Sequence, residues 1–298
     1  MTARAVPDRS GELDDARTGW RIHWDHFGRR GHDRERGRET IVFMNGLGMA
    51  TDAWYTSVPQ VHPEFDVLLF DYPGQGRSTR RDDPCTIPQI CELVARILDR
   101  LEIDRVHTQG VSYGGFVTAD FGRLFPDRVL TQTLSGVLLS STHSFRMYQE
   151  LSLAFYAQGA AAFDLYTRYL YEKIFSERFL TRIHDKVERM RTKFHDSYRD
   201  QTYCLTRLTE AQDALLAALP EHLDGYRAVT APTVVIAGEH DRAVPAWMQE
   251  ALAAIYPASR FVLLPGCGHL TYFEEPDAFW GHLRALARAK SIAYRTEA

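Results

Sequence analysis

Short, unbroken hydrophobic segments recur along the chain and end at glycine, asparagine or aspartate. The clearest of these segments are residues 41–44, 67–70 and 233–237. Further strands with weaker patterns are predicted at residues 19–27, 105–109 and 261–264, and another within residues 129–139. Strands that are apolar on both faces are typical of a parallel sheet covered by helices. The pattern therefore predicts a mostly parallel sheet.

Helical patterns lie between these strands. Residues 87–101 repeat apolar side chains at the spacing that places them on one face of a helix. Further helices are predicted at residues 113–125, 247–256 and 276–289. Strands that alternate with helices indicate the α/β class and a doubly wound sheet.

One long segment breaks this alternation. Residues 141–226 contain no convincing strand and are rich in leucine, alanine and aromatic residues at helical spacing. We therefore expect a helical insertion there, between two parts of a core formed by residues 19–140 and 227–298. Residues 1–18 are polar and are expected to form a flexible tail.

The composition is that of an ordinary globular protein and excludes several classes. Of 298 residues, 35 are Lys or Arg and 39 are Asp or Glu, so the formal net charge is −4. Without a basic excess we expect no nucleic-acid partner. No segment approaches the ~18 apolar residues of a transmembrane helix, and no secretory signal is visible. Four scattered cysteines fit a cytoplasmic protein without a metal site.

The strongest chemical signal is the sequence Gly-Val-Ser-Tyr-Gly-Gly at residues 110–115. It follows a predicted strand and opens a predicted helix, which is the context of a Gly-x-Ser-x-Gly nucleophile elbow. A serine on so sharp a turn needs small neighbours, and the glycines supply them. Its hydroxyl then projects out of the sheet. Ser112 is therefore the candidate nucleophile.

A serine hydroxyl needs a base, and the base needs an orienting acid. Asp241 lies on the turn after strand 233–237, and His269 lies on the loop after strand 261–264. Serine, aspartate and histidine in this order form the triad of α/β-hydrolases. We therefore expect Asp241 to orient His269, and His269 to activate Ser112.

Three neighbouring side chains leave alternatives open. Glu239 and His240 flank Asp241 and could replace the acid or the base, although capping or packing is favoured for His240. Residues 138–143, which follow the preceding predicted strand, contain no competing carboxylate. Cys267 could act as a nucleophile, but a small packing residue is the favoured interpretation.

These motifs resemble those of the α/β-hydrolase fold superfamily, over residues 19–140 and 227–298. Residues 71–78, Asp-Tyr-Pro-Gly-Gln-Gly-Arg-Ser, are similar to the D-x-x-G-x-G-x-S turn of that superfamily. The resemblance implies that the helical insertion is a cap over the active site and that no organic cofactor or metal is required.

The resemblance also implies an oxyanion hole. One donor is the backbone N–H of Tyr113, and the other is the backbone N–H of Leu47 on the loop after strand 41–44. Asn45 and Gly46 are expected to support that loop. The Asn-Gly form of the loop is similar to that of hydroxyacyl transferases and enol-lactonases of the fold.

We therefore expect a serine hydrolase that cleaves a carboxylic ester, thioester or lactone of a small-molecule acyl substrate through an acyl-enzyme on Ser112. The alternatives are an acyltransferase that uses a thioester of CoA or of an acyl carrier, a cofactor-free haloperoxidase, and a non-catalytic ligand-binding protein. Residues 172–199 carry eight Lys or Arg against five Asp or Glu. An acyl carrier protein is thus a possible partner, although a solvated helix face is favoured. The sequence does not predict the oligomeric state.

Overall fold

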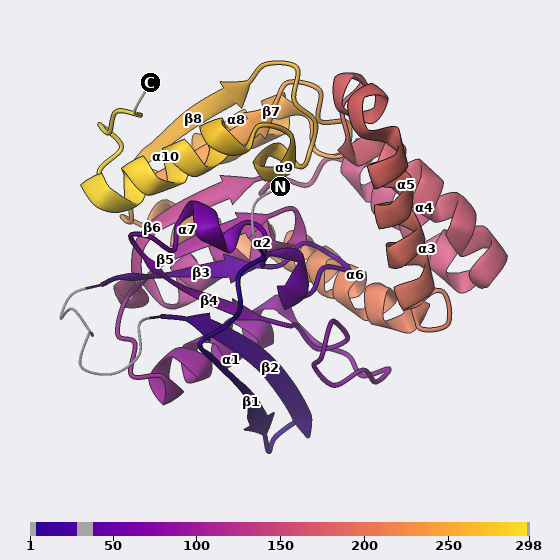
Figure 1. Ribbon diagram of the computed structural model, residues 1–298, viewed down its shortest axis with the longest axis horizontal. Helices are drawn as coiled ribbons and strands as arrows, with labels where there is room; N and C mark the ends of the chain where they lie inside the picture. Colours follow the sequence, from indigo (N-terminus) through magenta and orange to yellow (C-terminus); the bar gives the residue numbers. More distant parts are fainter. Residues whose placement is uncertain (1–3, 29–37, 297–298) are drawn as a thin grey trace.

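The computed structural model describes residues 4–28 and 38–296 and contains a single eight-stranded sheet in the order β1-β2-β4-β3-β5-β6-β7-β8 (Figure 1). The strands are β1 (Arg9–Asp15), β2 (Trp20–Phe27), β3 (Thr40–Met44), β4 (Asp66–Phe70), β5 (Val106–Val111), β6 (Val129–Ser135), β7 (Thr233–Gly238) and β8 (Ser259–Leu264). Strands β3 to β8 pair in parallel, whereas β1 and β2 pair antiparallel to their neighbours. The predicted mostly parallel α/β sheet is confirmed.

Helices cover both faces of the sheet. Four of them were predicted from the sequence: α1 (Ile87–Arg100), α2 (Tyr113–Leu124), α8 (Ala246–Ala253) and α10 (Pro276–Ala289). Val42 and Met44 of β3 contact the apolar cluster that includes α1, α2 and α8. Ile41 and Phe43 point the other way, into the cluster that includes α10. Burial on both faces explains why the strand is apolar at residues 41–44.

The N-terminal segment differs from the expected flexible tail. Residues 9–15 form β1, which pairs with β2 over its whole length. Leu13 and Asp15 are buried, while the positions that alternate with them are exposed. An edge strand with one solvated face carries few apolar residues, so its sequence pattern is weak. The expectation is therefore wrong for residues 9–15.

Five helices occupy the expected insertion: α3 (His143–Ala157), α4 (Ala160–Ile174), α5 (Glu177–Tyr198), α6 (Thr202–Ala217) and α7 (Leu219–Arg227). Figure 1 shows α3, α4 and α5 grouped beyond one end of the sheet, with α6 leading back toward it. Leu208, Leu215 and Tyr226 pack in the main core. The part of the insertion with its own apolar cluster is thus mostly α3 to α5.

The remaining helical turns are short. They are α9 (Thr271–Glu274) and the 3₁₀ turns at Thr51–Ala53, Val58–Gln60 and Pro126–Arg128. Within the described ranges, no helix combines the length and apolar character that a membrane span requires.

Candidate active site

Ser112 lies on a strained turn between β5 and α2. Its backbone dihedral angles are φ 56° and ψ −123°, a combination that non-glycine residues rarely adopt. A Cβ atom on Gly110 would lie 2.1 Å from the carbonyl oxygen of Gly114, and one on Gly114 would lie 2.1 Å from the carbonyl oxygen of Met44. The turn therefore requires both glycines, for the steric reason predicted from the motif.

His269 and Asp241 form a buried hydrogen-bonded pair. The distance from His269 Nδ1 to Asp241 Oδ2 is 2.7 Å, and the two residues are only 2% and 5% exposed. Since an ionised carboxylate only accepts hydrogen bonds, Nδ1 carries the hydrogen and Nε2 is left to accept a proton. Oδ1 of Asp241 accepts from the N–H groups of Ala243 and Val244, at 2.9 and 2.8 Å. These bonds fix the direction of the carboxylate.

The end of β6 connects this pair with the candidate nucleophile. The N–H of Ser112 donates to the carbonyl oxygen of Ser135 at 2.8 Å. The next residue, Gly136, lies against the imidazole, because a Cβ atom there would be 2.5 Å from Cε1 of His269. Ser112, Asp241 and His269 thus each follow the carboxyl end of a parallel strand, β5, β7 and β8, and the end of β6 contacts both Ser112 and His269.

The His269 loop is also bonded to the helical insertion. The N–H of His269 donates to the carbonyl oxygen of Ile174, at the end of α4, over 3.0 Å. Two residues further along the insertion, the N–H and Oγ of Ser176 both donate to the buried carboxylate of Glu274. The junction between α4 and α5 is therefore attached directly to the loop that carries the candidate base.

The two expected oxyanion donors lie on different segments, Leu47 on the loop after β3 and Tyr113 at the start of α2. Within the described residues, neither Leu47 nor Tyr113 donates its N–H to a backbone carbonyl. Asn45 is fully buried, and its Nδ2 donates to the carbonyl oxygen of Phe70 at 2.8 Å. Its Oδ1 accepts from Trp54 Nε1 at 2.7 Å. The side chain of Asn45 thus connects the loop to β4 and to Trp54, which follows the loop in sequence.

Gln75 is a further support of this loop that the sequence reasoning missed. Gln75 is fully buried, and with its amide oriented to satisfy both neighbours, Oε1 accepts from the N–H of Gly48 at 2.9 Å while Nε2 donates to the carbonyl oxygen of Met49. A Cβ atom on Gly46 would lie 2.9 Å from Met49 Sδ, so a larger residue would crowd the loop. The available signal was the position of Gln75 within the turn at residues 71–78.

The alternative acid, base and nucleophile have other contacts. Glu239 and His240 are exposed. Glu239 accepts from the N–H of Gly266 at 2.8 Å, which is a turn contact. Burial raises the pKa of the Cys267 thiol, and the charge of Glu274 acts in the same direction. A thiol that stays protonated at neutral pH is a poor nucleophile.

An aromatic cluster of the insertion covers the oxyanion loop. Leu47 packs against this cluster, which includes Tyr156 and Tyr166. The hydroxyl of Tyr156 donates to that of Tyr166 at 2.8 Å, and burial raises the pKa of both phenols. The ring of Phe194 lies 2.2 Å from where a Cβ of Gly48 would stand, so only glycine fits there. The aromatic cluster that lies over the oxyanion loop is therefore apolar and carries neutral hydroxyl groups.

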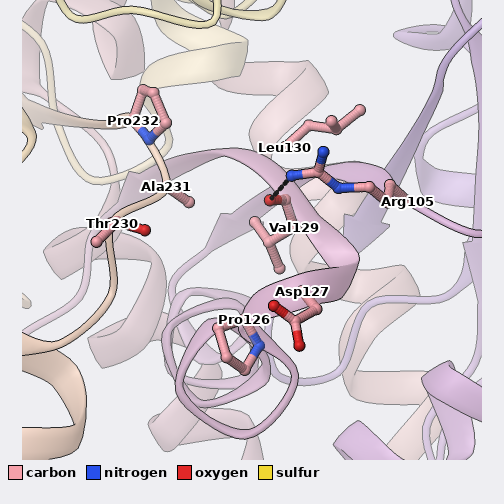
Figure 2. A pocket seen from close by; sticks show the side chains of 8 residues that line it. All are labelled: Arg105, Pro126, Asp127, Val129, Leu130, Thr230, Ala231 and Pro232. Carbon is pink, nitrogen blue, oxygen red and sulfur yellow. Dashed lines mark hydrogen bonds between the residues drawn. The ribbon is translucent and has the colours of Figure 1, made fainter.

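A pocket of about 480 Å³ lies at the opposite ends of the strands from the candidate active site. Figure 2 shows its lining residues, which are Arg105, Pro126, Asp127, Val129, Leu130, Thr230, Ala231 and Pro232. They stand at or just before the amino ends of β5, β6 and β7. In open α/β sheets, ligands bind outside the carboxyl ends of the strands. This pocket is therefore separate from the candidate active site.

Comparisons with known proteins agree with this architecture. The model of the α/β-hydrolase fold family matches residues 39–276, and the chain belongs to that family. A 2-hydroxy-6-oxononadienedioate/2-hydroxy-6-oxononatrienedioate hydrolase of Pseudomonas putida is 26% identical over 298 residues, which cover 93% of this chain and 94% of the relative. A pimeloyl-(acyl-carrier protein) methyl ester esterase of Edwardsiella ictaluri is 27% identical over 274 residues, covering 88% of this chain and 98% of the relative.

Solved structures show the same fold. The enol-lactonase from Burkholderia xenovorans superposes with a TM-score of 0.77 at 23% sequence identity, covering 92% of this chain and 98% of the lactonase. The family match and the sequence relatives together show that this chain is an enzyme, a hydrolase of the α/β-hydrolase fold.

Proposed function

We propose that this protein is a serine hydrolase that cleaves a carboxylic ester, thioester or lactone through an acyl-enzyme on Ser112. The observation that carries the proposal is the buried hydrogen bond between His269 and Asp241 at 2.7 Å, close to a serine whose backbone is held in a strained turn. A nucleophile, a base and an oriented acid at one place are the minimum that acyl transfer to serine requires.

In the proposed reaction, Nε2 of His269 takes the hydroxyl proton as Oγ of Ser112 attacks the carbonyl carbon. The N–H groups of Leu47 and Tyr113 stabilise the oxyanion of the tetrahedral intermediate. Asp241 holds the imidazole in place and stabilises its charged form. His269 then protonates the leaving alcohol or thiol, and the acyl-enzyme remains. Water, deprotonated by His269, then attacks the carbonyl carbon of the acyl-enzyme. The bond to Oγ of Ser112 breaks as His269 returns the proton to Oγ, and the free acid is released.

The covering residues support an acyl group of mixed polarity. The aromatic cluster offers apolar area, and the paired hydroxyls of Tyr156 and Tyr166 offer neutral hydrogen-bonding groups. The names of the relatives, an ester hydrolase and a hydrolase of an unsaturated keto acid, support substrates with a reactive carbonyl group.

A substrate panel tests the proposal. Wild type and Ser112→Ala are compared on p-nitrophenyl esters of increasing chain length, on lactones and on acyl thioesters, with and without an added alcohol or thiol. We expect turnover by wild type that Ser112→Ala lacks, with the free acid as product. If the acyl group passes to the added acceptor in preference to water, the protein is a transferase. Equal turnover by both proteins would contradict the proposal.

A further inference from the structure

The side chain of Gln249, on α8, links three parts of the candidate site. Its Nε2 donates to Oδ2 of Asp241 at 3.0 Å and to the carbonyl oxygen of Val244 at 2.8 Å. Its Oε1 accepts from the N–H of Gly136 at 2.8 Å. Both hydrogens and the oxygen of the amide are therefore used, and the side chain is fully buried.

Two of the three partners of Gln249, Asp241 and Gly136, contact the imidazole of the candidate base. Oδ2 of Asp241 is the oxygen that also receives Nδ1 of His269. Gly136 is the residue on which the imidazole rests, since a Cβ atom there would meet the ring at 2.5 Å. One amide thus contacts both the acid and the backbone that supports the imidazole.

A buried amide is costly unless its hydrogen bonds are made. Met248 and Leu252, the buried neighbours of Gln249 on α8, are apolar and belong to the main core. An apolar residue at position 249 would suit this environment better. It would, however, leave the N–H of Gly136 unpaired and Asp241 with one donor fewer.

We propose that Gln249 is a positioning residue that holds Asp241 and Gly136 in the relative arrangement that places the imidazole of His269. The proposal rests on the serine hydrolase function proposed above. The amide donates to Oδ2, the same oxygen that accepts from Nδ1 of His269, and its N–H group partly stabilises the negative charge of the carboxylate. Gln249 does not touch the reacting atoms, so it acts through Asp241 and Gly136.

Replacement by methionine, Gln249→Met, keeps the length of the side chain and removes its hydrogen bonds. We expect kcat to fall on the order of 10- to 100-fold, as for a small misplacement of a catalytic group, while KM stays within about twofold. With one donor lost, Asp241 interacts more strongly with a protonated imidazole. The acid limb of the pH–rate profile should therefore move to higher pH.

A matched control separates positioning from stability. Gln132 on β6 is equally buried, and its Nε2 donates to Thr233 Oγ1 at 3.3 Å, outside the candidate site. Its Oε1 is buried without a partner among the described residues, so Gln132→Met removes a buried amide without breaking a network and should leave the pH–rate profile unchanged. Gln249→Glu is a second test: its carboxylate faces that of Asp241 and should move the acid limb further than Gln249→Met does.

A readout without turnover keeps this test independent of the proposed function. The hydrogen between His269 Nδ1 and Asp241 should give a downfield proton NMR signal, whose position follows the protonation of the imidazole. We expect the midpoint of this titration to shift in both Gln249 variants and not in Gln132→Met. Unchanged midpoints in both Gln249 variants would overturn the positioning role, whatever their thermal stability. Absence of ester turnover in wild type would overturn the hydrolase proposal alone.

Discussion

The core half of the candidate site and the insertion that covers it are held by different forces. Around Asp241, four hydrogen bonds of 2.7 to 3.0 Å fix the carboxylate and the imidazole. In the insertion, Tyr156, Phe163 and Tyr166 pack with ring centroids 4.8 to 6.2 Å apart. Hydrogen bonds are directional, whereas aromatic packing tolerates several orientations.

This difference assigns separate tasks to the two regions. A reaction that moves a proton between named atoms needs fixed directions, and the core provides them. Under the proposed function, selection of an acyl group needs a surface of suitable shape, and the aromatic cluster of the insertion offers an apolar one. Substitutions in the core should therefore lower kcat, and substitutions in the insertion should change KM and substrate choice.

The largest effect is expected at His269. His269→Ala removes the proposed base, so ester turnover should fall on the order of 10³-fold or more while the fold is retained. Steady-state kinetics on a p-nitrophenyl ester would measure the loss. The exposed neighbour of the acid supplies the control, because His240→Ala should stay within about twofold of wild type. A comparable loss in His240→Ala would reassign the base.

The next effect is expected at Gly136, which touches the imidazole without any hydrogen bond to it. Its φ of 64° and the 2.5 Å approach to His269 leave no space for a methyl group. Gly136→Ala should displace the ring and lower kcat by about 100-fold. Gly281→Ala is a control, since a Cβ atom there meets nothing within 4 Å. Full activity in Gly136→Ala would show that the position of the ring is not restricted.

A smaller effect is expected in the aromatic cluster. Tyr156→Phe removes the hydroxyl that donates to Tyr166, a bond whose net contribution is about 1 kcal/mol. We expect KM for an ester to change by up to about fivefold, with kcat nearly constant. Tyr226→Phe removes a similar buried hydroxyl that donates to Asp120 and should leave KM unchanged. A large fall in kcat for Tyr156→Phe would contradict the division of tasks.

The smallest effect is expected at Cys267. Burial raises the pKa of this thiol, so it stays protonated at neutral pH and loses its proton only in alkaline solution. Activity should therefore gain no contribution from a thiolate between pH 7 and pH 9, and Cys267→Ala should retain kcat within about threefold. Inactivation of wild type, but not of Cys267→Ala, by iodoacetamide at pH 8 would show a reactive thiol at this position.

The sequence predicts the parts of the site whose chemistry is local. The glycines around Ser112 are required by the turn itself, and Asp241 and His269 end strands with recognisable apolar patterns. Strand β1 escaped prediction because its stability comes from pairing with β2 and from one half-buried face. A weak local pattern is compatible with such an edge strand.

Gln249 escaped prediction for a different reason. Its partner Gly136 lies 113 residues away in sequence, and α8 shows no pattern that marks position 249. Gln75 escaped prediction for the same reason, because its supporting role depends on hydrogen bonds to the backbone of the loop at Gly48. Side chains that support a site through distant backbone groups become visible only when the fold brings those groups together.

The most direct test of the account is whether Ser112 is an activated nucleophile. Intact-mass spectrometry after incubation with a fluorophosphonate probe would compare wild type with Ser112→Ala. The account predicts one added probe group on wild type and none on the variant. Absence of labelling on wild type, or equal labelling of both proteins, would contradict it.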